Sequence, residues 1–323
     1  MQRLDGVPGL VCFNGQLIPR DDARISITNQ AFNYGTGVFE GIRAYTNHTR
    51  SALNVFRLED HMNRLKRSAK LMRLDLDLSA EEMSTLVIDL LTANDAQHDT
   101  YVRPIVFKSA LLPGVGFGVR LSGVSTEFAI TMIPMGSYTN PAGLRCAIST
   151  WRRVPDGALP ACAKITGSYA NNALAMEDAQ SAGLDDALLL NMRGTLSEAT
   201  TSNVFVVVGG RLVTPPVTAD ILPGITRQTV IELAAQELDM PTHEREVRLS
   251  DLYDADECFL TGTGVEVAPV IEIGHRPIGA GVIGPITDAV RGVYRDAVRG
   301  ALPKYRHWIT SAASLADRRL VQS

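Results

Sequence analysis

The sequence predicts two domains that both mix helices with strands, in an α+β or α/β arrangement. Three observations support this prediction. The chain has 323 residues, more than a single hydrophobic core usually serves. Short runs of alternating apolar residues are interspersed with segments in which apolar residues recur every three or four positions. A stretch rich in turn residues, "MGSYTNPAG", interrupts the pattern. We therefore expect a first domain over 1–134, a linker over 135–143 and a second domain over 144–323.

The first domain contains both kinds of segment. Alternating runs predict strands over 10–15, 24–29 and 52–58, with turns at Asn14-Gly15 and Thr46-Asn47. Two amphipathic helices are expected over 58–73 and 79–95, and Ser79 is the expected N-cap of the second. Strands over 100–111 and 127–135 then flank a glycine-rich loop, "PGVGFGV" (113–119), which we interpret as mobile.

The second domain is richer in strands. Strands are expected at 145–151, 185–192, 202–215, 243–249 and 257–264. Helices should follow Lys164, follow the "PGIT" turn at 223–226, and occupy 284–302. The last residues, 311–323, are expected to be a loosely held tail.

Composition excludes several classes of function. Apolar residues make up 45% and charged residues 20%, as in a globular protein. The net charge is −4 and no Lys/Arg run occurs, which argues against a nucleic-acid partner or a membrane-binding patch. The opening residues contain no signal-peptide core, and no stretch has the apolar length of a membrane span. The four cysteines are scattered, so neither a disulfide framework nor a zinc or other metal site is indicated. We expect a cytoplasmic protein.

Lys164 is the most suggestive single residue. The chain has five lysines, and this one stands between small and apolar residues ahead of an apolar helix, in "ACAKITGSYANNALAM". Apolar surroundings disfavour the charged amine, lower its pKa and make it nucleophilic, as a Schiff-base lysine must be. From this stretch alone, an ordinary surface lysine remains the simpler interpretation.

Two turns could bind an anion. "LPGITRQTVIELAAQEL" (222–238) places Thr226 at a helix start, where backbone N–H groups and the helix dipole favour an anion. "LTGTG" (260–264) is a small-residue turn after a strand, which could bring backbone amides close to a ligand. Each could equally be an ordinary capped helix or tight turn. The "GVGFG" loop lacks the strand–helix context of a dinucleotide site.

Two of three notable charged residues have simple structural explanations, and the third, Arg103, is harder to dismiss. Arg64 is four residues from Asp60, so an exposed i,i+4 ion pair is the default. Glu198, in "GTLSEATTSNVF", would be a solvated glutamate. Arg103 lies in the apolar strand run "TYVRPIVF", where an unpaired charge is costly, so it requires an anionic or aromatic partner.

Taken together, these stretches resemble the branched-chain amino acid aminotransferases of the fold-type IV pyridoxal-phosphate class. The similarity extends over nearly the whole chain, from residue 13 to residue 270, with the motifs in family order: "YGTGVFEGIR", "YVRP", "AKITGSY", "LSEATTSNVF" and "LPGITR". It implies a small α/β domain plus a larger, mixed, β-barrel-like domain with helices, and pyridoxal 5′-phosphate as cofactor. The implied reaction is ping-pong transamination between Leu, Ile or Val and 2-oxoglutarate through pyridoxamine phosphate.

The resemblance also implies roles for individual residues. Lys164 matches the lysine that bonds the cofactor and shuttles the substrate proton. Glu198 matches the partner of the pyridine nitrogen, and Tyr169 the partner of the phenolate oxygen. The phosphate group would be bound by Arg64, Ile225, Thr226 and Thr263. The substrate carboxylate would be bound by the Thr263 and Gly264 amides. The side-chain pocket would be lined by Tyr34, Phe39, Arg103, Tyr138, and by Phe117 and Val119 of a loop that reaches the neighbouring subunit, which implies a homodimer or higher oligomer.

Three departures from the family pattern affect the substrate side. "SEATTSN" replaces the usual glycine-containing "SEGxGEN", Met135 stands where a tryptophan is frequent, and a short insertion occurs near "SALLPGVG". They leave the preferred amino donor open. Other fold-type IV activities are the alternatives: D-amino acid or (R)-amine transaminase, or aminodeoxychorismate lyase. A catalytically inactive scaffold is a third possibility, which the presence of Lys164, Tyr169 and Glu198 disfavours.

Overall fold

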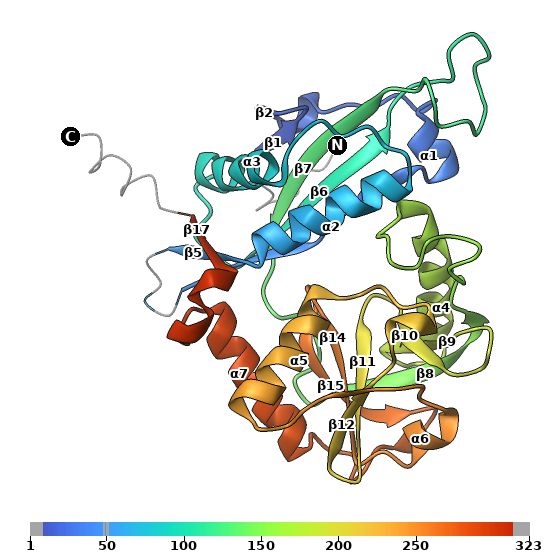
Figure 1. Ribbon diagram of the computed structural model, residues 1–323, viewed down its shortest axis with the longest axis vertical. Coiled ribbons are helices and arrows are strands. Elements are labelled where there is room, and N and C mark those ends of the chain that lie inside the picture. Colours follow the sequence, from blue (N-terminus) through green and yellow to red (C-terminus); the bar gives the residue numbers. More distant parts are fainter. Residues whose placement is uncertain (1–8, 48, 50–51, 313–323) are drawn as a thin grey trace. The chain divides into compact units, whose positions relative to one another are not determined.

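The computed structural model describes residues 9–47, 49 and 52–312, which form two compact units (Figure 1). Unit 1 runs from the N-terminal side to Gly136 and includes two later segments, Ala163–Gly167 and the chain from Ala297 onward. Unit 2 comprises Ser137–Cys162 and Ser168–Asp296. The boundary after Gly136 lies within the expected linker 135–143. The division drawn from the sequence does not anticipate that the two later segments pack with unit 1.

Unit 1 is built on an antiparallel sheet with eight strands in the described residues. The order is β17-β5-β4-β6-β7-β1-β2, and β3 also pairs with β6. The strands are β1 (Leu10–Phe13), β2 (Gln16–Pro19), β3 (Gly37–Phe39), β4 (Ile42–Thr46), β5 (Leu53–Phe56), β6 (Thr100–Lys108), β7 (Thr126–Pro134) and β17 (Ile309–Ala312). The hairpin expected at Asn14-Gly15 is confirmed: φ is 49° and 82° at these residues, as a two-residue hairpin turn requires.

The helices of unit 1 are α1 (Gln30–Tyr34), α2 (Leu58–Leu71) and α3 (Ala80–Ala93). Helices α2 and α3 contact each other and strands of the sheet (Figure 1). Ser79 caps α3 as expected: its side chain accepts a hydrogen bond from Glu82 N (3.1 Å), and the Glu82 carboxylate accepts one from Ser79 N (2.7 Å). Both helices lie within two residues of the ranges that the apolar spacing predicts.

Unit 2 has a mixed sheet with nine strands in the described residues, in the order β10-β9-β8-β15-β14-β11-β12-β13, with β16 beside β15. Strand β8 is parallel to both β9 and β15. The strands are β8 (Leu144–Arg152), β9 (Asp186–Leu190), β10 (Leu196–Ala199), β11 (Asn203–Val208), β12 (Arg211–Thr214), β13 (His243–Glu244), β14 (Glu257–Gly262), β15 (Glu266–Ile273) and β16 (Arg276–Pro277). Its core is formed by aliphatic residues of these strands, including Val204, Leu260 and Val270.

The helices in the second part of the chain are α4 (Tyr169–Ser181), α5 (Ile225–Glu237), α6 (Leu249–Tyr253) and α7 (Pro285–Val298). Short 3₁₀ turns occur at η1 (Arg20–Asp22), η2 (Thr166–Ser168), η3 (Val217–Ala219) and η4 (Pro303–Trp308). Within the described residues, every helix is too short or too polar to cross a bilayer.

Two expected strands are wrong, one entirely and one mostly. The run 24–29 lies between η1 and α1 and forms no strand, because Ile25 and Ile27, the apolar residues of its alternation, are exposed and face no core. The run 243–249 forms a strand only at His243–Glu244, and α6 begins at Leu249. Both strand residues are exposed, and β13 pairs at the sheet edge with β12 alone. A longer strand here would bury few apolar side chains and would therefore gain little stability. Of the expected tail, Ser311 and Ala312 belong to β17, and 313–323 lie outside the described residues.

Candidate active site

Lys164 lies on a short segment that pairs with β3 of unit 1. Ile165 forms an antiparallel bridge with Val38. Phe39 N donates to Lys164 O (3.0 Å), and Lys164 N donates to Ser68 Oγ on α2 (3.2 Å). The Lys164 backbone is therefore fixed by hydrogen bonds to both a strand and a helix.

The Lys164 side chain is half-buried, and its Nζ lies 4.9 Å from the centre of the Phe39 ring. Its neighbours Ala163 and Ile165 are buried. This confirms the apolar surroundings inferred from the sequence. Lys164 is thus neither fully buried nor fully exposed, and the hydrogen bonds of its segment hold its backbone within unit 1.

Arg64 is buried on α2, one helical turn before Ser68, with an exposed fraction of 5%. Its Nε and Nη2 donate to the two oxygens of Glu40 (2.6 and 2.8 Å). The expectation of an exposed pair with Asp60 is therefore wrong about exposure; the Asp60 carboxylate accepts a hydrogen bond from Arg57 Nε (2.5 Å). Glu40 was not predicted from the sequence as a site residue.

Glu40 is fully buried and also contacts His61, whose Nδ1 lies 2.8 Å from Glu40 Oε2. Burial alone would raise the pKa of Glu40, but the charge and hydrogen bonds of Arg64 and the contact with His61 hold it well below its usual range. Burial lowers the pKa of His61 despite Glu40. At neutral pH, Glu40 is thus a carboxylate and His61 is neutral, with its proton on Nδ1 facing the carboxylate.

Arg103 lies on β6 beside two aromatic rings. Its guanidinium carbon is 4.9 Å from the centre of the Phe39 ring and 5.1 Å from that of Tyr101, and its Nη2 donates to Tyr101 Oη (2.8 Å). Of the anionic or aromatic partner that was expected, the aromatic one is present, but Arg103 is exposed, so the burial that motivated the expectation is absent. Tyr101 was not predicted from the sequence. In the structure, Gly41 leaves room for it, because a Cβ at Gly41 would collide with Tyr101 Oη.

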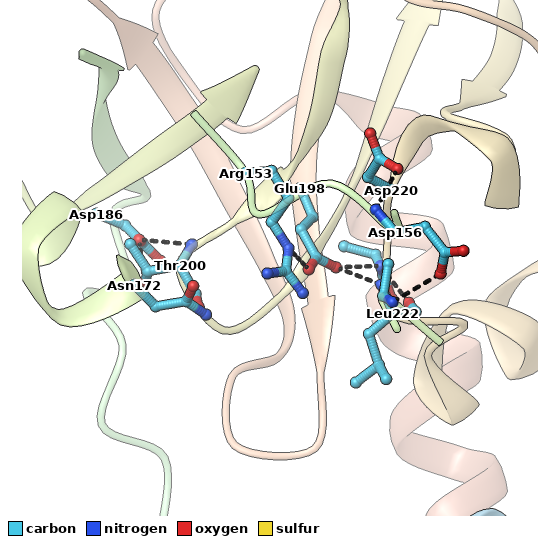
Figure 2. A network of polar contacts seen from close by, with 10 residues as sticks. Arg153, Asp156, Asn172, Asp186, Glu198, Thr200, Asp220 and Leu222 are labelled. Atoms are coloured by element: carbon cyan, nitrogen blue, oxygen red, sulfur yellow. Dashed lines mark hydrogen bonds and ion pairs between the residues drawn. The ribbon is translucent and has the colours of Figure 1, made fainter. Parts of the chain in front are cut away.

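Glu198 of β10 is buried in unit 2, with an exposed fraction of 6%, so the solvated interpretation is wrong. Arg153 Nε donates to Glu198 Oε1 (2.7 Å), while Asn203 Nδ2 and Leu222 N donate to Oε2 (3.1 and 3.0 Å). Figure 2 shows Glu198 between Arg153 on one side and Leu222 on the other. These donors stabilise the carboxylate form and fix its orientation. Arg153 and Asn203 were not predicted from the sequence.

The start of α5 lies against the same network. Gly224 is the N-cap of α5 and supplies no side-chain cap to its first turn, which contains Ile225 and Thr226. A Cβ on Gly224 would collide with Asn203 Oδ1, so a larger residue here would displace the Asn203 side chain. The helix start thus retains the character of an anion site, close to the residue that binds Glu198.

The turn that carries Thr263 and Gly264 joins β14 to β15. Strand β14 pairs Thr261 with Asn203, which places this turn beside the Glu198 network. A Cβ on Gly264 would lie 2.7 Å from Tyr138 Oη, so unit 2 brings Tyr138 to the predicted carboxylate-binding turn.

Tyr169 is the first residue of α4, and Asn172 one turn later donates to Thr200 O. Thr200 Oγ1 in turn donates to Asp186 Oδ1 (2.7 Å). Figure 2 shows this second network, which anchors the unusual "EATTSN" loop. Of the remaining predicted residues, Tyr34 ends α1, and Phe117 and Val119 lie on the loop between β6 and β7, all three exposed.

Comparisons with known proteins show the family and the fold of the chain. Residues 37–273 match the family model described as amino-transferase class IV. A probable branched-chain-amino-acid aminotransferase of Aquifex aeolicus is 40% identical over 300 residues, covering 92% of this chain and 95% of that protein. The crystal structure of a branched-chain aminotransferase from Thermoproteus uzoniensis with norvaline has a TM-score of 0.88 at 40% identity, covering 94% and 99% of the two chains. The branched-chain amino acid aminotransferase from Thermobaculum terrenum in its PLP-bound holo form has a TM-score of 0.89 at 36% identity, covering 96% and 100%.

Proposed function

Because the chain belongs to the class IV aminotransferase family, we propose that it catalyses transamination between branched-chain L-amino acids and 2-oxoglutarate with pyridoxal 5′-phosphate as cofactor. The likeness to solved structures over 94% of the chain confirms the predicted two-domain α/β fold of the fold-type IV class. The observation that carries the proposal is Lys164, held by backbone hydrogen bonds to β3 and α2 with its amine against Phe39.

The chemistry of the donor set fits the cofactor. Lys164 offers an amine for its aldehyde, and Arg64 offers a buried guanidinium for its phosphate. Glu198 offers a buried carboxylate for the ring nitrogen, and the uncapped helix start at Ile225 and Thr226 suits the phosphate. In this assignment the Thr263 hydroxyl also binds the phosphate, and Tyr169 donates to the phenolate oxygen.

When bound, the cofactor supplies a ring that accepts the electron pair released as the substrate Cα–H bond breaks. The side chains do the rest. Lys164 Nζ takes the proton from Cα and returns it at the cofactor's C4′ position. Glu198 holds a proton on the ring nitrogen, because Arg153, Asn203 and Leu222 keep its carboxylate ionised and oriented. The amides of Thr263 and Gly264 bind the substrate carboxylate.

One pocket must accept both an aliphatic side chain and the γ-carboxylate of glutamate. We assign the carboxylate to Tyr34, Arg103 and Tyr138, and the aliphatic chain to Phe39 with Phe117 and Val119 of a second subunit. Arg103 suits this dual role because its guanidinium already lies against aromatic rings, which it can share with an aliphatic substrate.

The proposed assembly is a homodimer, supported by an exposed apolar surface on unit 1. Phe32 of α1 and Phe117 and Val119 of the β6–β7 loop are 71%, 59% and 74% exposed. Gln30 holds the two segments together by donating to Gly118 O (3.0 Å) and Arg120 O (2.9 Å). Exposed apolar surfaces of this kind mark protein–protein contacts. The four free cysteines are compatible with the reducing cytoplasm, where we place the reaction.

The decisive experiment measures single half-reactions of the holoenzyme by the absorbance of the bound cofactor. We expect L-Leu, L-Ile, L-Val and L-Glu to react, and D-Ala and (R)-1-phenylethylamine to react at least about 100-fold more slowly, since a pocket built for one enantiomer misplaces the other. Preference for D-Ala or the amine would instead identify one of the alternative fold-type IV activities.

Arg103→Met tests the dual pocket. We expect kcat/KM for glutamate and 2-oxoglutarate to fall about 10- to 100-fold, which corresponds to roughly 1.4–2.7 kcal/mol, because their carboxylate loses its charged donor. The leucine half-reaction should fall only about threefold. Equal losses for leucine and glutamate would show that Arg103 has a structural role only.

A further inference from the structure

We propose that Glu40 is a positioning residue, which holds the Arg64 guanidinium in the orientation that binds the cofactor phosphate. The proposal rests on the proposed function, because the contact of Arg64 with phosphate is part of that assignment. Glu40 itself touches neither the cofactor nor the substrate in this account and acts only through Arg64.

The pairing of Glu40 with Arg64 fixes both the position and the plane of the guanidinium. Two parallel bonds, from Nε (2.6 Å) and Nη2 (2.8 Å), join one edge of Arg64 to the carboxylate. A bidentate pair adds geometric specificity that a single bond lacks. His61, which is neutral and donates from Nδ1, holds Glu40 Oε2 from a further direction (2.8 Å). His61 thus helps to orient the carboxylate that in turn orients the arginine.

Glu40 also connects Arg64 to Lys164 through a closed circuit within unit 1. The residue before Glu40, Phe39, donates its backbone N–H to Lys164 O, and Lys164 N donates to Ser68 Oγ. Ser68 is one turn after Arg64 on the buried face of α2. The circuit Lys164–Phe39–Glu40–Arg64–Ser68 therefore sets the distance between the amine that receives the aldehyde and the guanidinium that receives the phosphate. The aldehyde and the phosphate arm are carried by neighbouring ring positions of one small molecule, so the two protein groups must keep a fixed separation.

Electrostatics also favours this role. Arg64 is 5% exposed, so its charge would be costly to leave without a buried anion when no cofactor is bound. Glu40 neutralises that charge and keeps the arginine in place beforehand, so binding the phosphate requires no rearrangement. The opposing effect is repulsion between the Glu40 carboxylate and the phosphate. If repulsion were dominant, removing the Glu40 charge would strengthen phosphate binding. Whether the loss of that charge weakens or strengthens phosphate binding therefore decides between positioning and repulsion.

The test compares pyridoxal 5′-phosphate with pyridoxal, which lacks the phosphate. Dissociation constants of the full chain, freed of cofactor, are measured by fluorescence titration for both compounds, and the preference for the phosphorylated compound reports the contribution of the phosphate alone. Glu40→Gln should lower this preference about tenfold, and Arg64→Gln about 100-fold or more. Glu59→Gln, at an exposed glutamate of α2, the helix that carries Arg64, should leave the preference unchanged. A general loss of stability would weaken both compounds equally and leave the preference intact.

The outcomes separate this proposal from the proposed function. An unchanged preference in Arg64→Gln would overturn the assignment of Arg64 to the phosphate. A lowered preference in Arg64→Gln with an unchanged or raised preference in Glu40→Gln would overturn only the role of Glu40. Where Glu40→Gln fails to fold, Glu40→Asp keeps the charge but shortens its reach, and a preference equal to that of the wild type would count against positioning. In the double variant Glu40→Gln/Arg64→Gln, the loss of preference should equal that of Arg64→Gln alone, because Glu40 acts only through Arg64. A loss equal to the sum of the two single losses would contradict the positioning role.

Discussion

Two lysines of unit 1 differ in burial and in the chemistry of their neighbours. Lys108 is fully buried, and its Nζ contacts Val124 O (2.8 Å), Thr126 Oγ1 (3.1 Å) and the Asp75 carboxylate (3.7 Å). Those acceptors satisfy the hydrogen-bond donors of this buried side chain and give it a structural role. Lys164 is only half-buried, with its amine against an aromatic ring. Burial alone would have identified the wrong lysine, and the chemistry of the neighbours identifies the right one.

We therefore expect substitution of Lys164 to affect mainly activity and substitution of Lys108 to affect mainly stability. Lys164→Ala should lower turnover of leucine and 2-oxoglutarate by more than about 1,000-fold and remove the absorbance of lysine-bound cofactor, with little change in stability. Lys108→Met should retain most turnover but lower the free energy of unfolding by about 1–3 kcal/mol, because buried acceptors lose their donor. Turnover assays and denaturant unfolding of both variants provide the check. Near-native turnover in Lys164→Ala would rule out its assigned role.

The residues missed by sequence reasoning are those that hydrogen-bond to the predicted site residues. Family motifs singled out Arg64 and Glu198, but not Glu40 or Arg153, which bind them across 24 and 45 positions of the chain. No local pattern encodes such pairings. A weak signal did exist for Glu40: it is a charge within the apolar run "GVFEGI", and the rule that required an anionic or aromatic partner for Arg103 would require a partner for Glu40 too.

At the scale of elements, local signals predicted what local interactions build. The apolar spacing of α2 and the capping box of α3 involve residues three or four apart, so the sequence shows them directly. The segment 163–167 is different. Its position depends on pairing with β3, more than 120 residues earlier, as in the bridge between Val38 and Ile165. Neither alternation nor turn residues indicate such a contact.

Gly35 tests how far this pairing controls the lysine. Its φ is 67°, and a Cβ there would lie 2.6 Å from Gly167 Cα. Gly35→Ala should therefore cost about 2–3 kcal/mol of stability and reduce kcat/KM at least about tenfold, since the backbone around Lys164 must shift. Gly15→Ala is the matched control, with φ at 82° and no atom within 4 Å of the added Cβ. It should cost about 1 kcal/mol and leave kcat/KM unchanged.

Denaturant unfolding and steady-state kinetics of the two glycine variants measure both quantities. The difference in stability between them isolates the steric contact from the backbone strain that they share. If the two variants lost equal stability and both retained full activity, the contact between Gly35 and Gly167 would have no part in placing Lys164.

At the scale of the whole molecule, the order of residues along the chain differs from their division into units. The chain passes between units after residues 136, 162, 167 and 296. Lys164 thus belongs to unit 1, while Tyr169, only five residues later, and Glu198 belong to unit 2. A linear division at 135–143 finds the first of these passages because turn residues mark it. The other three depend on tertiary contacts, which composition does not reveal.

The assembly of whole molecules supplies the last prediction. Val119 and Phe117 are among the most exposed large apolar residues of unit 1, and the hydrogen bonds from Gln30 hold their loop in place before any partner binds. Burying a valine side chain is worth about 1.5–3 kcal/mol, and an aspartate in its place would also have to lose its hydration. Val119→Asp should therefore weaken the dimer by at least about 10- to 100-fold in dissociation constant.

Leu71→Asp is the control for this prediction, because Leu71 is also an exposed apolar residue of unit 1, at 48%, but lies at the end of α2 rather than on the loop. Sedimentation equilibrium over a range of concentrations should show the wild type and Leu71→Asp as dimers and Val119→Asp shifted toward monomer. Because the loop is assigned to the partner's pocket, the shifted variant should also lose leucine turnover in proportion to its monomer fraction, and raising the protein concentration should restore it. A wild-type monomer, or equal shifts in both variants, would contradict the assignment of this surface to a second copy of the chain.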